Sequence, residues 1–206
     1  MSRADRLFLC FCMRPRLKAC CALVLGATGL LWPPLLTLAL LVPLADWHGA
    51  RLVRHYHPSF RDDLEEQLTA ACLLSCGIHA GEHHYVFAKP SGGIDHWLLR
   101  GVADTLRVDV LAPKRDYVVM SGGEGGIFPP DELIPPRFTT TDLGCVEVYY
   151  RDIDMVQLEN GTLRLHTLGG REHEFPAHQG TALEAAQYLR QRLRDYKARV
   201  SDGFSA

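Results

Sequence analysis

The feature that most constrains this chain is a run of 27 uncharged residues, from Ala19 to Ala45. As one continuous helix, the run would reach about 40 Å at ~1.5 Å per residue, more than the ~30 Å hydrocarbon core of a bilayer. The core of a soluble domain rarely needs so long a stretch without charge. The run therefore predicts a membrane anchor over residues 19–45.

Two adjacent prolines, Pro33 and Pro34, interrupt this run. Proline cannot donate to the helix ladder, and it disfavours helical geometry at the residue before it. The halves on either side, residues 19–32 and 35–45, are each too short to cross a bilayer alone. A kinked single span and a re-entrant hairpin both fit, with Pro33 and Pro34 at the kink. A cleaved signal peptide fits less well, because the run exceeds the usual apolar core of about 7 to 15 residues.

The charges and cysteines beside the run bear on location. Residues 1–18 carry five basic side chains against one acidic side chain, which suits an anionic membrane surface and places the N-terminus in the cytoplasm. The seven cysteines are an odd number, with four in or beside the apolar segment. The other three, Cys72, Cys76 and Cys145, lack the even count and dense spacing of a disulfide framework, which favours a reducing compartment. We expect a membrane-associated protein whose folded domain is cytoplasmic, with an extracytoplasmic domain on a single-span anchor as the alternative.

The length of 206 residues allows one ordinary domain and an attachment segment. A net charge of −2 gives no case for nucleic-acid binding. The predicted segments are a basic N-terminus (1–18), the anchor (19–45), a linker (46–58), an α+β domain (59–200) and a tail (201–206).

The first part of the predicted domain contains a helix and three strands. Ser59 is a candidate N-cap for a helix that Gly77 ends, with Leu64, Leu68 and Cys72 on its apolar stripe. Strands are expected over residues 83–90, 106–111 and 115–120. Residues 121–142 hold glycines and prolines in number and are expected to be a long loop excursion.

Residues 144–176 give the clearest β-pattern of the chain. Asn160-Gly161 predicts a type I′ hairpin, which would pair Leu158 with Leu163 and Val156 with Leu165. At the next turn, a three-residue loop that includes Arg171 would set Leu165 against Phe175.

A C-terminal amphipathic helix is expected after these strands. Thr181 and Glu184 form a capping-box pattern at its start. One apolar seam then follows at helical spacing, made of Ala186, Leu189, Leu193, Tyr196 and Val200.

An aromatic residue followed by Arg-Asp-Ile, at Tyr150 to Ile153, precedes the two hairpins and the helix. Residues 146–200 thereby resemble the C-terminal part of a bacterial membrane-associated pleckstrin-homology-like domain. The resemblance implies a small β-barrel or sandwich with a capping helix. Together with the predicted anchor, it leads us to expect an α+β fold: an N-terminal membrane-embedded helix or helical hairpin, then a small bent antiparallel sheet or partial barrel closed by a C-terminal amphipathic helix. It also implies membrane attachment, usually without catalytic activity.

Two cysteines and two histidines form the sharpest candidate site. Cys72, Cys76, His79 and His83 are spaced by four, three and four residues, and zinc accepts this ligand set. Gly77 and Gly81 interrupt the helix that would align them, so a cysteine-bearing helix face with a polar exit loop is the competing interpretation. Zinc is the one cofactor that the sequence suggests.

Lys114 and Arg115 are candidate contacts for a lipid headgroup or another anion, and Arg100 and Arg107 could join them. The SGGEGG segment at 121–126 lacks the Lys-Ser/Thr ending of a phosphate loop. With no catalytic motif present, we expect a membrane-anchored, non-enzymatic interaction module that binds membrane lipids or a protein partner. A metal-binding protein or small metalloenzyme using the Cys/His set is the alternative.

Overall fold

The computed structural model describes residues 2–12, 15–31, 41–79, 81–92, 105–126, 144–176 and 179–203. The chain divides into two compact units. The first unit comprises Met1–Asp63, Ser91–Thr105 and Gly126–Phe138, and the second comprises Leu64–Pro90, Leu106–Gly125 and Thr139–Ala206. The fold is α+β, with two antiparallel sheets and a C-terminal helix.

The first unit contains helices α1 (Arg3–Cys12) and α2 (Pro15–Leu31) and the beginning of α4 (Leu41–Ser75). Helix α1 packs against α4: the ring of Phe8 lies 5.3 Å from that of His48, and Cys12 Sγ lies 3.4 Å from the carbonyl oxygen of Ala45. A Cβ on Gly49 would lie 2.6 Å from Cys12 Sγ. Glycine at position 49 therefore permits the close approach of the two helices.

The predicted anchor at 19–45 coincides with most of α2 and the first turn of α4. Residues 32–40, with Pro33 and Pro34, lie outside the described residues. Within the described ranges, no helix combines the length and the apolarity needed to cross a membrane. The kink at the two prolines stays a prediction.

Helix α4 corrects the predicted linker at 46–58. The helix is continuous from Leu41 to Ser75 with Pro58 inside it, so Ser59 is not its N-cap. Proline inside a helix costs about 3 kcal/mol, but most helical stability in proteins comes from packing of an apolar face. Val53, Leu64, Leu68 and Cys72 on α4 are all buried, and this packing outweighs the local signals at Pro58 and Ser59.

The first sheet has the order β1-β2-β3-β4, with β1 Tyr85–Ser91, β2 Thr105–Pro113, β3 Tyr117–Gly126 and β4 Val146–Tyr149. Only three residues join β2 to β3, and Lys114 N donates to Tyr117 O at 2.8 Å across this turn. The three strands expected between residues 83 and 120 are thus confirmed in outline. The predicted loop at 121–142 is wrong at its start, because residues 121–126 continue β3.

A short 3-10 turn, η1 (Tyr150–Asp152), leads into the second sheet, β5 Ile153–Glu159, β6 Thr162–Thr167 and β7 Glu172–Pro176. Asn160 and Gly161 have φ of 50° and 77°, as a type I′ turn requires. Leu158 faces Leu163 and Val156 faces Leu165, so the predicted register of this hairpin is confirmed.

The second hairpin differs from the prediction in register. Leu165 lies opposite His173, and Leu163 lies opposite Phe175. The loop has three residues, but they are Leu168, Gly169 and Gly170, closed by the bond from Thr167 N to Arg171 O at 2.9 Å. Gly170 has φ of 75°. A three-residue hairpin loop ends in one left-handed residue, and Gly170 takes that position where Arg171 was predicted to close the loop.

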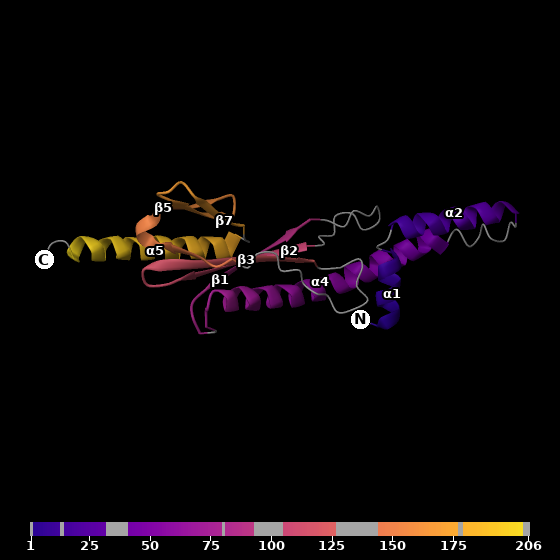
Figure 1. The fold of residues 1–206 in the computed structure, drawn as a ribbon, viewed down its shortest axis with the longest axis horizontal. Coiled ribbons are helices and arrows are strands. Elements are labelled where there is room, and N and C mark those ends of the chain that lie inside the picture. Colours follow the sequence, from indigo (N-terminus) through magenta and orange to yellow (C-terminus); the bar gives the residue numbers. More distant parts are fainter. Residues whose placement is uncertain are drawn as a thin grey trace. The chain divides into compact units, whose positions relative to one another are not determined.

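Helix α5 (Gln179–Gly203), yellow in Figure 1, contacts β5, β6 and η1. It begins before Thr181, so the predicted capping box does not mark its start. Ala186, Leu189 and Leu193 are buried as expected, but Val200 is 42% exposed because the last turns of α5 extend beyond the core. The core of the second unit joins both sheets to α5 and includes Phe87, Leu111, Met120, Tyr150, Leu163, Leu165, Phe175, Ala182 and Leu189.

Candidate functional site

A cleft of about 430 Å³ lies between the first sheet and β7 in the second unit. We call it the polar cleft. Its lining comes from β2 (Arg107 and Asp109), β3 (residues 120–124), the approach to β4 (Gly144 and Val146) and β7 (residues 172–175).

Strand alternation explains why polar side chains line this cleft. Side chains two residues apart on a strand share one face. The face that buries Leu111 of β2 and Met120 of β3 in the core therefore continues to Asp109 and Arg107 on one strand and to Gly122 and Glu124 on the other. The polar cleft is thus the polar continuation of the core face of the first sheet.

An ion pair forms the floor of the cleft. Arg107 donates to Asp109 from Nε at 2.9 Å and from Nη2 at 3.1 Å. The side chain of Asp109 is only 7% exposed, and that of Arg107 is 54% exposed. Burial raises the pKa of Asp109, although the guanidinium of Arg107 acts in the opposite direction. The site therefore holds a buried carboxyl group, and its negative charge is stabilised by the half-exposed guanidinium of Arg107.

Two glycines of the SGGEGG segment have a steric role in β3. A Cβ on Gly122 would overlap Oδ1 of Asp109, and a Cβ on Gly125 would lie 2.9 Å from Cδ1 of Leu64. Gly122 makes room for the buried carboxyl group, and Gly125 makes room for α4 on the other face of the sheet. Glycine at these positions serves close packing in a strand.

Two strand edges face the cleft. Strand β4 pairs with β3 only from Tyr117 to Met120, so among the described residues Ser121–Gly126 have no ladder partner on that side. Strand β7 pairs with β6 and ends the order of its sheet. An unpaired edge presents N–H and C=O groups that can accept another strand.

The charge at the mouth of the cleft is acidic. Arg107 is accompanied by the carboxylates of Asp109, Glu124, Glu172 and Glu174. Arg164 of β6 pairs with two of these, Glu172 at 3.3 Å and Glu174 at 2.9 Å. Burial lowers the pKa of His173, so this side chain is neutral at pH 7. Among the described residues of the cleft and Arg164, the carboxylates outnumber the cations.

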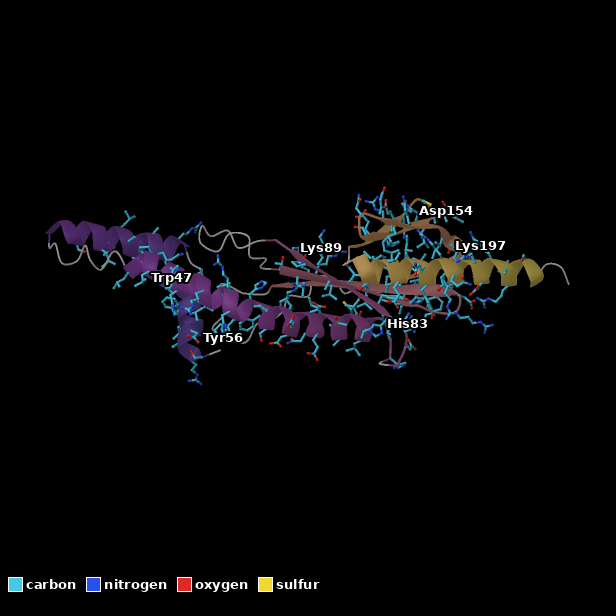
Figure 2. The ribbon with its side chains drawn as sticks, turned by 180° about the vertical axis from the view of Figure 1, so that it is seen from behind. Trp47, Tyr56, His83, Lys89, Asp154 and Lys197 are labelled. Atoms are coloured by element: carbon cyan, nitrogen blue, oxygen red, sulfur yellow. The ribbon has the colours of Figure 1, made fainter. Side chains whose placement is uncertain are left out.

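The structure does not bring the predicted metal ligands together. Cys72 is fully buried on α4, with Sγ 3.9 Å from the carbonyl oxygen of Val108. The ring of His83 instead packs at 4.8 Å from both Tyr85 and Tyr188, in the loop labelled in Figure 2. In the described part of the chain, no three His, Cys, Asp or Glu side chains converge on a metal position.

The end of α4 explains why this set separates. Helix α4 stops at Ser75, and Gly77 with φ of 61° turns the chain away. His79 is exposed in the following loop, where its carbonyl oxygen accepts from Glu82 N at 2.9 Å. The helical spacing that would align the two histidines with Cys72 and Cys76 is therefore lost.

Cys145 joins Cys76 at a place that no local sequence pattern marks. Burial, together with the neighbouring Cys76 thiol, raises the pKa of Cys145 to about 11. Beside them, Ser75 Oγ lies 3.0 Å from Ser121 Oγ. The pairing of β3 with β4 creates this neighbourhood, because Val146 lies opposite Met120 and so places Cys145 near Ser121.

Lys114 and Arg115 lie in the turn between β2 and β3, as predicted. The amino group of Lys114 forms an ion pair with Glu82, and Arg115 is exposed with its carbonyl oxygen accepting from Arg199 at 3.1 Å. Arg107 is paired in the cleft, and Arg100 lies outside the described residues. The four cations proposed from the sequence therefore do not form one cluster among the described residues.

Comparison with protein-family models, with curated proteins and with solved structures finds no match for this chain.

Proposed function

We propose that this protein is a membrane-attached, non-enzymatic interaction module. Its first unit makes the attachment, and residues 85–203 form a pleckstrin-homology-like domain that binds a protein partner in the polar cleft. The observation that carries the proposal is the apolar surface of the N-terminal helices.

Seven large apolar side chains of α1, α2 and the first turns of α4 are exposed. Leu23 and Val24 on α2 are 73% and 61% exposed, and Trp47 on α4 is 57% exposed. The others are Leu7, Leu17, Leu41 and Leu44. Exposed apolar surface of this density marks an interaction with membrane or protein, and the basic residues among 1–18 favour an anionic lipid surface.

The order of elements after residue 84 supports the pleckstrin-like assignment. A four-stranded sheet is followed by a three-stranded sheet and a C-terminal helix, all joined to one core. This is the small antiparallel architecture, closed by a helix, that the Tyr150 to Ile153 pattern and the following segment imply. Domains of this kind usually act by binding. The polar cleft of the second unit is consistent with such a role.

The cleft suits an extended peptide segment with Lys or Arg side chains. Among the described residues, β3 beyond Met120 and the outer edge of β7 have no ladder partner, so these edges can supply main-chain hydrogen bonds to an added strand. Among the described residues that line the cleft, carboxylates outnumber cations, and this excess of carboxylates would favour cationic side chains on the partner.

Membrane attachment is tested by fractionating cells that express the full chain. The wild type is expected in the membrane fraction, and the double variant Leu23→Arg/Val24→Arg is expected to shift to the soluble fraction. Leu74→Arg is the matched control, since Leu74 is 82% exposed but lies on the part of α4 in the second unit. A wild-type chain found in the soluble fraction would overturn the attachment.

Peptide binding is tested with the full chain and a fluorescent ten-residue peptide of alternating lysine and valine. The change Glu124→Lys should weaken binding about tenfold, equal to ~1.4 kcal/mol, and should reduce its salt dependence. Glu66→Lys makes the same charge change on the exposed face of α4, outside the cleft, and should leave binding unchanged. Equal loss in both variants would mean that net charge, and not the cleft, controls binding.

A further inference from the structure

Three thiols lie around the junction of α4 with the first sheet. Cys72 is fully buried, Cys76 is half-buried just after the end of α4, and Cys145 is exposed just before β4. All three are free thiols. They differ in access to solvent, and access controls which thiol a dissolved oxidant reaches.

Two independent contacts place Cys76 beside Cys145. Ser75, the residue before Cys76, bonds through Oγ to Ser121 Oγ at 3.0 Å. In the β3–β4 ladder, Val146 faces Met120, so the next residues along each strand, Cys145 and Ser121, are neighbours. Burial, followed by the influence of the neighbouring Cys76 thiol, raises the pKa of the Cys145 thiol, which agrees with this placement.

We propose that Cys76 and Cys145 are an oxidative modification site that closes to a disulfide and ties the end of α4 to the start of β4. Neither residue lies within a helix or a strand: Cys76 occupies the turn after α4, where its N–H still donates to the carbonyl oxygen of Cys72 at 3.2 Å, and Cys145 follows Gly144 in a non-strand segment. Small backbone adjustments at these two positions can bring the sulfur atoms to bonding distance without breaking a strand or a helix.

The reaction is thiol–disulfide exchange with a low-molecular-weight disulfide such as oxidised glutathione. The exposed Cys145 loses its proton and attacks one glutathione sulfur, breaking the glutathione disulfide and releasing one glutathione thiolate. Cys76 then loses its proton and attacks Cys145 Sγ of the mixed disulfide, releasing the second. Two protein thiols are oxidised, and one oxidised glutathione is reduced to two molecules that take up the two protons.

The crosslink would act at the rim of the polar cleft. Gly144 and Val146, on either side of Cys145, line the cleft, as does Ser121. Oxidation would therefore fix one wall of the cleft to α4. This inference concerns the thiols alone and does not depend on the proposed membrane attachment or peptide binding.

The test uses the reduced full chain incubated with oxidised glutathione and digested under non-reducing conditions for mass spectrometry. We expect most of the oxidised Cys76 and Cys145 to appear in one peptide pair that is linked through these two residues, while Cys72 remains a free thiol. The reaction should accelerate as pH rises from 7 to 9, roughly as the thiolate fraction of Cys145 increases. In Cys145→Ser, no crosslink to Cys76 should form.

A second measurement guards against crosslinking of unfolded chain. The urea midpoint should rise on oxidation of the wild type, return on reduction with dithiothreitol, and stay constant in Cys145→Ser under both conditions. Cys20→Ser, which changes an exposed cysteine of α2, should behave as the wild type in both assays. Separate glutathione adducts on Cys76 and Cys145, or a Cys72–Cys76 link in place of the expected one, would overturn the proposal.

Discussion

The carboxyl group of Asp109 occupies the space that a side chain at position 122 would fill, since a Cβ on Gly122 would overlap Oδ1 of Asp109. The carboxyl group is held there by three hydrogen bonds from Arg107 and is almost fully buried. Position 122 is therefore limited to glycine by the buried carboxyl group of Asp109 on the neighbouring strand.

Gly122→Ala is expected to lower the free energy of unfolding by about 1–3 kcal/mol, because Asp109 must move out of its bonded position. Urea unfolding of the full chain measures this. The loss should be smaller in an Asp109→Ala background, where the overlap is removed. Gly81→Ala is the control with no neighbour within 4 Å of the added carbon, and it should have little effect. Equal costs in both backgrounds would show that the overlap is not the cause.

Leu68 and Leu74 lie on the same part of α4 with opposite exposure, 1% and 82%. Leu68→Ala should lower the free energy of unfolding by about 2–5 kcal/mol, because it removes a buried side chain between α4 and the sheet. Leu74→Ala should change it by less than about 0.5 kcal/mol. Similar values for the two variants in urea unfolding would contradict the packing of this half of α4 on β3.

Gly169 and Gly170 are adjacent in the second hairpin, but only Gly170 has a positive φ, 75°. Gly170→Ala is expected to cost about 1–2 kcal/mol, since a Cβ disfavours the left-handed region. Gly169→Ala should be neutral or slightly stabilising, because its added carbon meets nothing closer than Thr167 Oγ1 at 4.0 Å. A two-residue Gly-Gly loop would instead penalise both changes, so urea midpoints of the two variants distinguish the registers.

Tyr150 is buried, its hydroxyl group donates to the carbonyl oxygen of Lys114 at 3.2 Å, and burial raises its pKa to about 12. The ordinary value of 10.0 applies to the unfolded chain. Between about pH 10 and 12 the unfolded state therefore binds fewer protons, and stability falls as pH rises, by at most ~1.4 kcal/mol per pH unit from this residue.

The variant Tyr150→Phe should lose this contribution to the alkaline slope. At pH 7 the free energy of unfolding of this variant should be lower than that of the wild type by about 1 kcal/mol, because the carbonyl group of Lys114 loses its hydrogen-bond donor. Tyr85, whose pKa burial also raises to about 12, keeps its own contribution in the variant. Urea unfolding at several pH values from 8 to 12 checks the prediction, and parallel curves for variant and wild type would contradict it.

Local sequence signals were sufficient where a short segment sets its own geometry. The Asn160-Gly161 turn needs two positive φ values, and the apolar residues on each side then fix the pairs Leu158–Leu163 and Val156–Leu165. The buried positions Ala186, Leu189 and Leu193 of α5 follow in the same way from helical spacing.

Local signals gave wrong predictions where tertiary packing decided between two structures for the same segment, a helix start or a continuous helix, and a loop or a strand. Pro58 and Ser59 indicated a helix start, but burial of Leu64, Leu68 and Cys72 keeps α4 continuous through them. Glycines at 122 and 125 indicated a loop, whereas they give room to Asp109 and Leu64. A glycine required by a neighbour on another element has the same local pattern as a glycine in a flexible segment.

Periodicity and turn chemistry act over a few residues, so they were enough to predict the α+β class, the strands of the second sheet, the first hairpin register and the amphipathic C-terminal helix. Three features arise from tertiary packing alone: the polar cleft, the pairing of the buried Asp109 with the half-exposed Arg107, and the approach of Cys76 to Cys145. These depend on strands and a helix far apart in the chain, and their positions follow from the packing of whole elements around the core.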